Sequence, residues 1–536
     1  MRKTGFYVIF VLIAGLVISS CANRGTPSGG NKDILPPTIT REVPDNYSTN
    51  FSGNEIRIYF DEYIKIKNLS KQLIVSPPMD PAPEVTPMSS ASKYIKIKIK
   101  DTLAPNTTYT FNFGNSIVDN NEENPFSYYT YVFSTGNYID SLSVKGLIKD
   151  ATLRAPDNFV SVMLYEVDSM YNDSIIYNKK PKYVTNTLDS TTTFTLQNLK
   201  AGTYKLIALK DANQDYQFQP KTDKIAFQEG FITVPVDSAE QFTLKLFSEE
   251  LEPRVINPRL VSGEKIAFAY EGNYKEMQIQ VQSDVPNTFQ HRITKDSQAD
   301  TLYYWYKPRL ETDSLLFQVT NNNYKAHFAV PLSEQKRDSM NVQAEPTGTI
   351  NFTEDFKLTN TVPFTNLDRN KVRILDKDSV AVAFKVTLDS LENRYALKFD
   401  KTESNSYAIQ ILPEALTDFF DATNDTLNYK LTTKKYADYG NVRVILKNAT
   451  YPVIAQITDN KGVVVAEAYS RNPEPIDFRH LKTGEFYLRV VYDTNENKKY
   501  DTGNFLKNQQ PERISYYKEK LDIRANFEMI YEFTLF

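Results

Sequence analysis

The stretch Ile95-Lys96-Ile97-Lys98-Ile99-Lys100 alternates apolar and basic side chains without a break. Successive side chains of a β-strand point to opposite faces of its sheet, so this order predicts a strand with one buried and one solvated face. A similar alternation, Ile56-Arg57-Ile58-Tyr59-Phe60, precedes it, and turns rich in Asn, Asp and Pro separate such segments. Regular short strands over about 100 residues predict a β-sandwich.

The composition of the whole chain favours the same class. Its 536 residues include 35 Tyr and 32 Phe but one Trp, and aromatic and β-branched residues fit pleated, half-buried surfaces. Since no helical heptad or long amphipathic helix is present, the sequence predicts an all-β protein. The net charge of −4, with 62 basic and 66 acidic residues well mixed, argues against a nucleic-acid partner.

Two internal repeats define the domain organisation. Tyr109-Thr110-Phe111 and Tyr407-Ala408-Ile409 lie 298 residues apart, and the strands 131–135 and 429–433 share that offset. A second pair, 199–206 and 481–488, lies 282 residues apart, and each member leads into an acidic turn. Repeats at fixed offsets indicate repeated structural units.

The repeats predict five modules in the order A-B-C-A′-B′. They span residues 36–137 (module A), 138–246 (module B), 247–345 (module C), 346–436 (module A′) and 437–536 (module B′). Residues 21–35 are polar and rich in Gly and Pro, as in a flexible tether, and residues 1–20 precede them.

The N-terminus carries an export pattern. Arg2 and Lys3 precede an apolar or small run from residue 6 to residue 18, which is short for a membrane span. Cys21, the one cysteine of the chain, follows small residues and excludes an internal disulfide. The segment resembles a bacterial lipoprotein signal peptide, which implies a palmitate-type lipid on Cys21 and a membrane partner for that lipid.

Module A resembles the bacterial Ig-like domain of the S-layer-protein type. The resemblance rests on the strand 56–62, on Leu103 to Phe111, and on the closing segments 117–125 and 131–136. Glu123 stands where that family usually has glycine, so we expect this turn to adopt another backbone form. Module A′ resembles the same family more weakly.

Modules B and B′ resemble carboxypeptidase-regulatory-like or prealbumin-like β-sandwiches through their "L-x-x-G-x-Y-x-L" strand and "D-x-N-x-D" turn. With the lipoprotein signal, the whole chain is similar to cell-envelope Ig-like lipoproteins of Bacteroidetes-type bacteria. The predicted fold is therefore a series of tandem Ig-like β-sandwich domains behind a signal peptide and a tether.

The resemblance implies a non-catalytic binding or structural module that engages other envelope proteins. The alternative is a surface-exposed lipoprotein that binds glycan or is adhesive. Surface lipoproteins of this type usually carry acidic residues after the lipidated cysteine, whereas Asn23 and Arg24 stand here. We therefore expect a lipid-anchored protein of the outer membrane, on its periplasmic face rather than the cell surface.

The acidic turns are candidate Ca²⁺ sites, because alternating oxygen side chains in a tight loop can converge on a hard cation. The candidate ligands are Asp211, Asn213, Asp215 and Asp223 in module B, and Asp493, Asn495, Asn497 and Asp501, followed by Gly503, in module B′. Position six lacks the glycine of an EF-hand, since Tyr216 and Lys498 stand there. The alternative is a hairpin turn whose Asp and Asn side chains cap their own backbone.

Two surfaces are weaker candidates for ligand binding. In Tyr303-Tyr304-Trp305-Tyr306, one face could offer Tyr304 and Tyr306 to a sugar, while core or interface packing is the simpler interpretation. Lys96, Lys98 and Lys100 could meet anionic lipids or glycans, although charges on a sheet often only block edge-to-edge pairing.

The sequence gives little support for catalysis, and we expect no enzyme. The three histidines, His291, His327 and His480, have no metal-ligand spacing. Asp61 and Glu62 are adjacent, and neighbouring strand residues point to opposite faces, so the two carboxylates cannot flank one bond.

Overall fold

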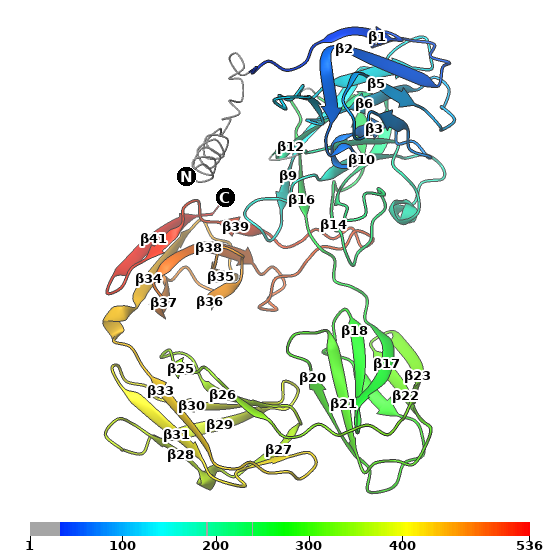
Figure 1. Ribbon diagram of the computed structural model, residues 1–536. Helices are drawn as coiled ribbons and strands as arrows, with labels where there is room; N and C mark the ends of the chain where they lie inside the picture. Colours follow the sequence, from blue (N-terminus) through cyan, green and yellow to red (C-terminus); the bar gives the residue numbers. More distant parts are fainter. Residues whose placement is uncertain (1–32, 189–190, 238, 536) are drawn as a thin grey trace, which may run out of the picture. The chain divides into compact units, whose positions relative to one another are not determined.

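The computed structural model describes residues 33–188, 191–237 and 239–535, and nearly all of its regular structure is β-strand (Figure 1). The one α-helix in this part of the chain, α2, is a short turn from Leu69 to Gln72. No helix within the described ranges is long and apolar enough to cross a membrane. The strands form paired sheets, so the predicted all-β class with tandem β-sandwiches is confirmed.

Module A consists of two sheets. In the first the order is β1-β2-β5-β4 with β7 beside β2, and in the second it is β3-β6-β8. The strands are β1 (Ile39–Val43), β2 (Glu55–Ile66), β3 (Ile74–Ser76), β4 (Glu84–Thr86), β5 (Ser92–Lys98), β6 (Thr108–Asn112), β7 (Ile117–Asp119) and β8 (Thr130–Ser134).

The predicted alternation on β5 is present. Ile95 and Ile97 are fully buried, whereas Lys96 and Lys98 lie on the opposite face. In the register of β2 with β5, Ile58 faces Ile95 and Arg57 faces Lys96. Burial of the isoleucines therefore fixes the register, because a slip by one residue would turn the lysines into the core.

Module A′ repeats the strand order of module A. Its sheets run β24-β26-β30-β29 and β25-β33-β31-β28, with β27 paired to β32. The first sheet corresponds to β1-β2-β5-β4 and the strands β28, β31 and β33 correspond to β3, β6 and β8. The strands are β24 (Val342–Glu345), β25 (Gly348–Thr349), β26 (Phe356–Asn360), β27 (Phe364–Leu367), β28 (Val372–Leu375), β29 (Phe384–Asp389), β30 (Arg394–Phe399), β31 (Ser406–Ile411), β32 (Leu416–Asp418) and β33 (Leu427–Thr432). Pairing of β24 extends this module a few residues before position 346.

Modules B and B′ also share a topology. In module B, β13 pairs with β10, β14 and β15, and in module B′, β38 pairs with β35, β39 and β40. The first and last strands of each module pair in parallel, β9 with β16 and β34 with β41. This agreement gives the 282-residue repeat a structural basis.

The strands of module B are β9 (Leu142–Asp150), β10 (Ser161–Glu166), β11 (Tyr183–Asn186), β12 (Thr193–Leu199), β13 (Gly202–Lys210), β14 (Lys224–Phe227), β15 (Ile232–Val234) and β16 (Phe242–Leu246). Those of module B′ are β34 (Gly440–Lys447), β35 (Val453–Thr458), β36 (Val464–Ser470), β37 (Ile476–Leu481), β38 (Gly484–Tyr492), β39 (Ile514–Tyr516), β40 (Leu521–Ile523) and β41 (Glu528–Thr534). Short 3₁₀ turns, η1 (Asp173–Tyr177), η2 (Arg369–Lys371) and η3 (Tyr436–Asp438), complete the regular structure of the described residues.

Module C is a two-sheet sandwich with the orders β17-β18-β21-β20 and β19-β22-β23. Its core contains Phe268, Tyr304 and Phe317, which meet at ring-centroid distances of 5.1 to 6.4 Å. The strands are β17 (Arg254–Ser262), β18 (Lys265–Glu271), β19 (Gln278–Val281), β20 (Gln290–Lys295), β21 (Thr301–Lys307), β22 (Ser314–Asn321) and β23 (Tyr324–Pro331).

The chain packs into two compact units. The first comprises module A to Ser143 together with 182–188 and 196–201, and the second comprises the remaining described residues. Within the first unit, Asn198 donates its side-chain amide to the carbonyl of Asp140 at 2.8 Å. Because this division is coarser than the five expected modules, the module boundaries stay a prediction.

Candidate functional site

The lipidation residue Cys21 lies outside the described residues, so its lipid stays a prediction from the sequence. The acidic turns are both described. In module B, the two carboxylate oxygens of Asp211 accept the backbone N–H groups of Asn213 at 3.0 Å, Gln214 at 2.6 Å and Tyr216 at 2.7 Å. Burial raises the pKa of the Asp211 carboxyl, while the N–H of Tyr216 acts in the opposite direction.

The other acids of the first turn are also hydrogen-bonded. Asp223 accepts the backbone N–H groups of Ala212 at 3.0 Å and Gln219 at 2.9 Å. Asp215 accepts the side-chain amide of Gln219 at 2.9 Å, and the side chain of Asn213 donates to the same glutamine.

The second turn is built in the same way. Asp493 is fully buried and accepts the backbone N–H groups of Asn497 at 3.0 Å and Lys498 at 2.9 Å. Asp501 accepts the side-chain amides of Asn495, at 2.6 Å, and Asn497, and it pairs with Lys499 at 3.0 Å.

Both turns place a non-glycine residue in the left-handed region at the position where an EF-hand has glycine. Tyr216 has φ of 61° and Lys498 has φ of 64°. This conformation costs about 1 kcal/mol for a residue with a Cβ. The carboxylates of Asp211 and Asp493 offset that cost, because each accepts the N–H of the strained residue.

The geometry therefore matches the capping alternative for the acidic turns. In residues 33–188, 191–237 and 239–535, no group of three or more His, Cys, Asp or Glu side chains is arranged to hold a metal ion. Since amide oxygens and backbone carbonyls can also bind Ca²⁺, the calcium hypothesis stays a prediction for both turns.

A buried aspartate also caps the turn of module A around Glu123. Glu123, which stands where the family usually has glycine, has φ of 67° and therefore a left-handed backbone. The carboxylate of Asp119 accepts the N–H groups of residues 121–124 at 2.7 to 3.0 Å. Burial acts to raise the pKa of Asp119, but these hydrogen bonds outweigh it and lower the pKa.

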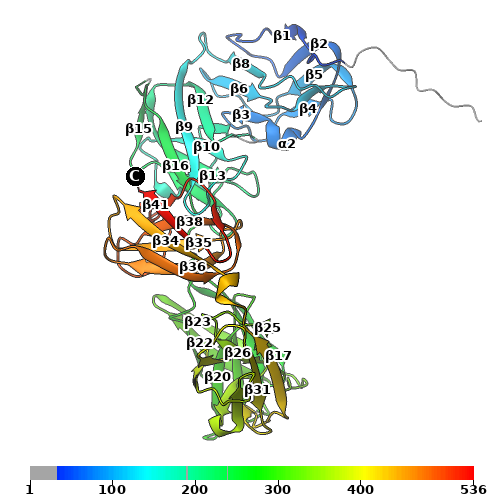
Figure 2. The ribbon, with the colours of Figure 1, turned by 90° about the vertical axis from the view of Figure 1, so that its left-hand side faces the viewer.

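The second acidic turn continues into a segment that docks on module B and on residues 247–249, which directly follow it (Figures 1 and 2). Thr502 donates its hydroxyl to the carbonyl of Ser248 at 2.6 Å, and the N–H of Phe505 donates to Glu249 at 2.5 Å. A Cβ on Gly503 would lie 2.6 Å from the ring of Phe247, so this position requires glycine. Sequence order alone does not predict this contact between modules B and B′.

A lysine lies beneath the docked segment. Lys205 is 4% exposed and donates to the carbonyls of Gln228 at 2.9 Å and Gly230 at 3.1 Å. Its ammonium group lies 5.2 Å from the ring of Phe227 and 5.7 Å from that of Phe505. The cation is thus satisfied by carbonyl dipoles and aromatic faces from both modules.

The proposed sugar platform is wrong for Tyr304 and Tyr306. They are 1% and 2% exposed and belong to the core of module C, because their face of β21 packs against the opposing sheet. Burial raises the pKa of Tyr306 to about 12. Core packing, the simpler interpretation, accounts for this face.

The other face of β21 forms a contact between modules C and A′. Trp305 is 2% exposed and clusters with Val362 and Phe419 of module A′. Its indole N–H donates to the hydroxyl of Thr294 at 2.9 Å. The amino group of Lys265 lies 4.6 Å from the Trp305 ring, which completes a buried aromatic contact.

The lysine face of module A is part of a mixed aromatic and basic surface. Tyr59 and Tyr94 lie opposite each other on β2 and β5, with ring centroids 5.6 Å apart. The guanidinium of Arg41 lies 5.0 Å from the Tyr59 ring, and that of Arg57 lies 5.9 Å from the Tyr94 ring. We call these four residues, with the flanking Lys96, the tyrosine–arginine face.

The remaining two lysines, Lys98 at the end of β5 and Lys100 just beyond it, have acidic neighbours. Lys98 faces Glu55 and Glu84 in the register, and Lys100 pairs with Glu84 at 3.0 Å. Their charges are therefore balanced locally, as is that of Arg57, which pairs with Glu55 at 2.7 Å.

The candidate catalytic residues are occupied in packing or hydrogen bonds. Asp61 accepts the hydroxyl of Thr38 at 2.6 Å and its N–H at 2.9 Å, which lowers the pKa of Asp61. The ring of His291 stacks on Tyr304 at 4.9 Å, and burial lowers the pKa of His291. His327 lies on β23 of module C, and His480 is the last but one residue of β37 in module B′. The histidines are not brought together.

A comparison with known families identifies the family of module A. Residues 33–135 match the family model of the bacterial Ig-like domain. The Ig-like resemblance of module A is confirmed. The Ig-like fold of this module is typical of structural or binding modules, and the match concerns residues 33–135 alone. No curated protein matches the sequence.

Several solved structures align weakly with the chain. The surface layer protein SbsC, domains 1–6, aligns at 11% identity over 91% of this chain and 67% of that chain, with a TM-score of 0.17. The TIE protein of Bacillus anthracis aligns at 11% identity over 98% and 78%, with a TM-score of 0.13. An I-band fragment of titin aligns at 12% identity over 52% and 98%, with a TM-score of 0.12. Such scores identify no common whole-chain arrangement.

Proposed function

We propose that the chain is a lipid-anchored, non-catalytic protein of the bacterial outer membrane, of the Bacteroidetes type, whose modules engage another envelope protein. The signal pattern ending at Cys21 supports the lipid anchor. The match of module A to the bacterial Ig-like family supports a structural or binding role. Asn23 and Arg24 after the cysteine favour the periplasmic face.

The observation that carries the binding role is the tyrosine–arginine face of module A. Tyr94 is 40% exposed, and the neighbouring Tyr63, which Lys93 approaches at 5.4 Å, is 55% exposed. Tyrosine and arginine are enriched among the residues that dominate protein–protein binding. Stacking with Arg41 and Arg57 already orders these rings, so little side-chain entropy remains to be lost on binding.

Crosslinking of the lipidated protein in native membranes, followed by affinity capture, tests the proposal. We expect reproducible recovery of an envelope protein, strongly reduced with Tyr59→Ala/Tyr94→Ala and with Cys21→Ala. Tyr138→Ala, which removes a 54% exposed tyrosine directly after module A, serves as the matched control. Recovery of polysaccharide without protein would favour the glycan-binding alternative and reject the proposed function.

Protease treatment of intact cells tests the leaflet separately. Protection of the chain, followed by cleavage after outer-membrane permeabilisation, is the expected result for the periplasmic face. Cleavage on intact cells would instead place the protein at the cell surface.

A further inference from the structure

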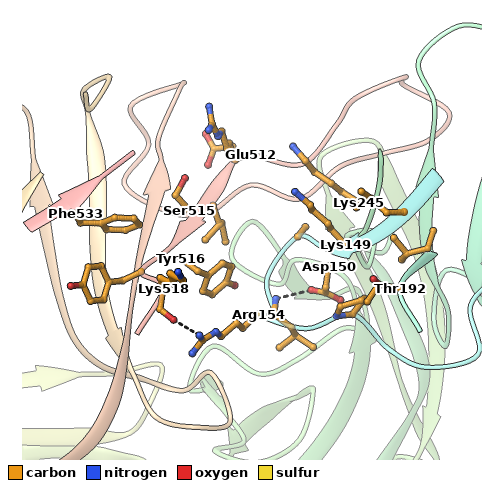
Figure 3. Close-up of a pocket in the computed structure, with 18 of the residues that line it drawn as sticks. Lys149, Asp150, Arg154, Thr192, Lys245, Glu512, Ser515, Tyr516, Lys518 and Phe533 are labelled. Carbon is orange, nitrogen blue, oxygen red and sulfur yellow. Dashed lines mark hydrogen bonds between the residues drawn. The ribbon is translucent and has the colours of Figure 1, made fainter. Parts of the chain in front are cut away.

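A cavity of about 910 Å³ lies within the second compact unit, between modules B and B′ (Figure 3). One wall comes from β9 and β16 of module B, and the opposite wall comes from β39 and its flanking residues. Arg154 closes one side, where its guanidinium donates to the carbonyl of Lys518 and lies 5.3 Å from the ring of Tyr487. The cavity is therefore bounded by modules that are held together by specific contacts.

Five cationic side chains line this cavity, and besides Arg154 and Lys518 these are Lys149, Lys245 and Arg513. Lys149 and Lys245 are direct partners in the parallel pairing of β9 with β16, and Figure 3 shows them extending side by side. Paired residues on neighbouring strands share a face and lie about 5 Å apart at the backbone. Arg513, from module B′, lines the cavity as well.

The acids of the cavity do not neutralise these cations. Asp150 pairs with Lys224 at 2.8 Å and accepts the N–H groups of Thr152 and Leu153. Glu512 accepts the N–H and hydroxyl of Thr494, at 2.9 and 3.0 Å, and the N–H of Asp501 at 3.1 Å. Both carboxylates are thus already paired or hydrogen-bonded within the protein.

No ion pair involves Lys149, Lys245 or Arg513 in the part of the chain that the structure describes. Burial lowers the pKa of Lys245, and the charges of Arg513 and Lys149 lower it further. Like charges gathered without a counter-ion reduce the stability of the fold. Lys149, Lys245 and Arg513 are all exposed to solvent, so an anion that enters the cavity can approach them.

The remaining wall of the cavity can contact the uncharged part of a ligand. Leu147, Leu153 and Ile514 contribute apolar surface, and Tyr516 and Ser515 contribute rings and hydroxyls that suit a sugar. The hydroxyl of Tyr516 is buried and interacts with the charge of Arg489. Sites of this volume with a few convergent polar groups are typical of small-molecule binding.

We propose that this cavity binds a small anionic saccharide, with its phosphate or carboxylate between Lys149, Lys245 and Arg513 and its ring against Leu153 and Tyr516. The two anionic groups share the chemistry that the cations recognise, namely negatively charged oxygens that accept charge-assisted hydrogen bonds. This site is distinct from the tyrosine–arginine face and does not depend on the proposed protein partner.

Calorimetric titration of the full chain in detergent, at constant ionic strength, tests the site with three probes: glucose 6-phosphate, galacturonate and glucose. We expect at least one anionic probe to bind with a Kd below about 1 mM and glucose to bind at least about tenfold more weakly. Preference for one anionic probe identifies phosphate or carboxylate as the recognised group. Equal binding of glucose, or no binding by either anion, would overturn the proposal.

Charge-removing variants locate the binding to the cavity. Lys245→Gln and Arg513→Gln should each weaken anion binding about tenfold or more, whereas Lys482→Gln, at an exposed lysine outside the cavity, should leave it unchanged. Removal of an uncompensated charge should also keep or raise the melting temperature of the unliganded protein. Unchanged affinity in folded Lys245→Gln and Arg513→Gln would contradict the site.

Discussion

The ring of Phe505 packs edge-on against Phe227, with ring centroids 5.2 Å apart, and joins the last module to the second. Phe505 is 2% exposed although it belongs to an otherwise polar turn segment. Thr502 and Gly503 contact Ser248 and Phe247, directly after module B, so the acidic turn of module B′ is a docking element at this end of module B.

Phe505→Ala should lower the free energy of unfolding by about 3 kcal/mol, because a buried phenyl group is lost and leaves a cavity between two modules. Urea denaturation followed by circular dichroism measures the change. The neighbouring Leu506, which is 53% exposed, provides the control, and Leu506→Ala should remain within about 0.5 kcal/mol of the wild type. Equal effects of both substitutions would argue against the packing role of Phe505.

Asp493→Ala should destabilise the protein by about 1 to 3 kcal/mol, because the N–H of Lys498 loses its acceptor while its backbone stays left-handed, and the N–H of Asn497 keeps only Asn495. Thermal unfolding measures the loss. Asn495→Ala is the control, since its side-chain amide donates to Asp501 near the surface. A neutral Asp493→Ala would show that the capping bonds are dispensable.

The calcium hypothesis for the two turns has its own test. Bound Ca²⁺ would stabilise the folded state by mass action, so the hypothesis predicts a melting temperature that rises with added Ca²⁺ and falls with chelator. The rise should disappear in Asp501→Asn/Asp215→Asn. Identical melting curves with Ca²⁺ and with chelator would reject calcium binding at both turns.

Much of the fold could be predicted because period-2 burial is a local signal. Ile95 and Ile97 are buried as their alternation indicates, and the two repeat offsets correspond to matching strand orders. The backbone conformation of the turns could not be predicted in this way. Glu123, Tyr216 and Lys498 are left-handed without being glycine, because a buried aspartate a few residues earlier accepts their N–H groups.

Contacts between modules could not be predicted from local patterns. The alternation at β21 correctly separated two faces and favoured core or interface packing, but it did not indicate which face is the core or that Trp305 meets Phe419. Lys149 and Lys245 become neighbours only through the parallel pairing of the first and last strands of module B. A buried aromatic such as Phe505 in a polar turn is the one local signal that indicates docking.

Glu264 should make the stability of module C depend on pH. It is 1% exposed and accepts Arg309 at 2.8 Å and Arg337 at 2.7 Å. Burial acts to raise its pKa, but the hydrogen bonds from Arg337 and Arg309 outweigh it and lower the pKa. A carboxyl whose pKa is lower in the folded state stabilises above its unfolded pKa, about 4.3, and loses that contribution as pH falls through the folded value.

Glu264→Gln should therefore cost about 2 kcal/mol at pH 7, since the arginine partners are partly exposed. The difference from the wild type should shrink as the pH falls from 5 to 3. Urea denaturation across this range measures both quantities, with the exposed Glu334→Gln as control. A difference that stays constant with pH would show that the charge of Glu264 does not stabilise the fold.

Trp305, the one tryptophan of the chain, reports directly on the contact between modules C and A′. Phe419→Ala removes a 2% exposed ring of its cluster, so the Trp305 environment should become more polar and its fluorescence emission should move to longer wavelength. Val380→Ala, at a 58% exposed position of module A′, should leave the spectrum unchanged. The far-ultraviolet circular dichroism of both variants should match the wild type, because each sandwich keeps its own core. An unchanged emission in Phe419→Ala would mean that Phe419 does not shield Trp305 from water in solution.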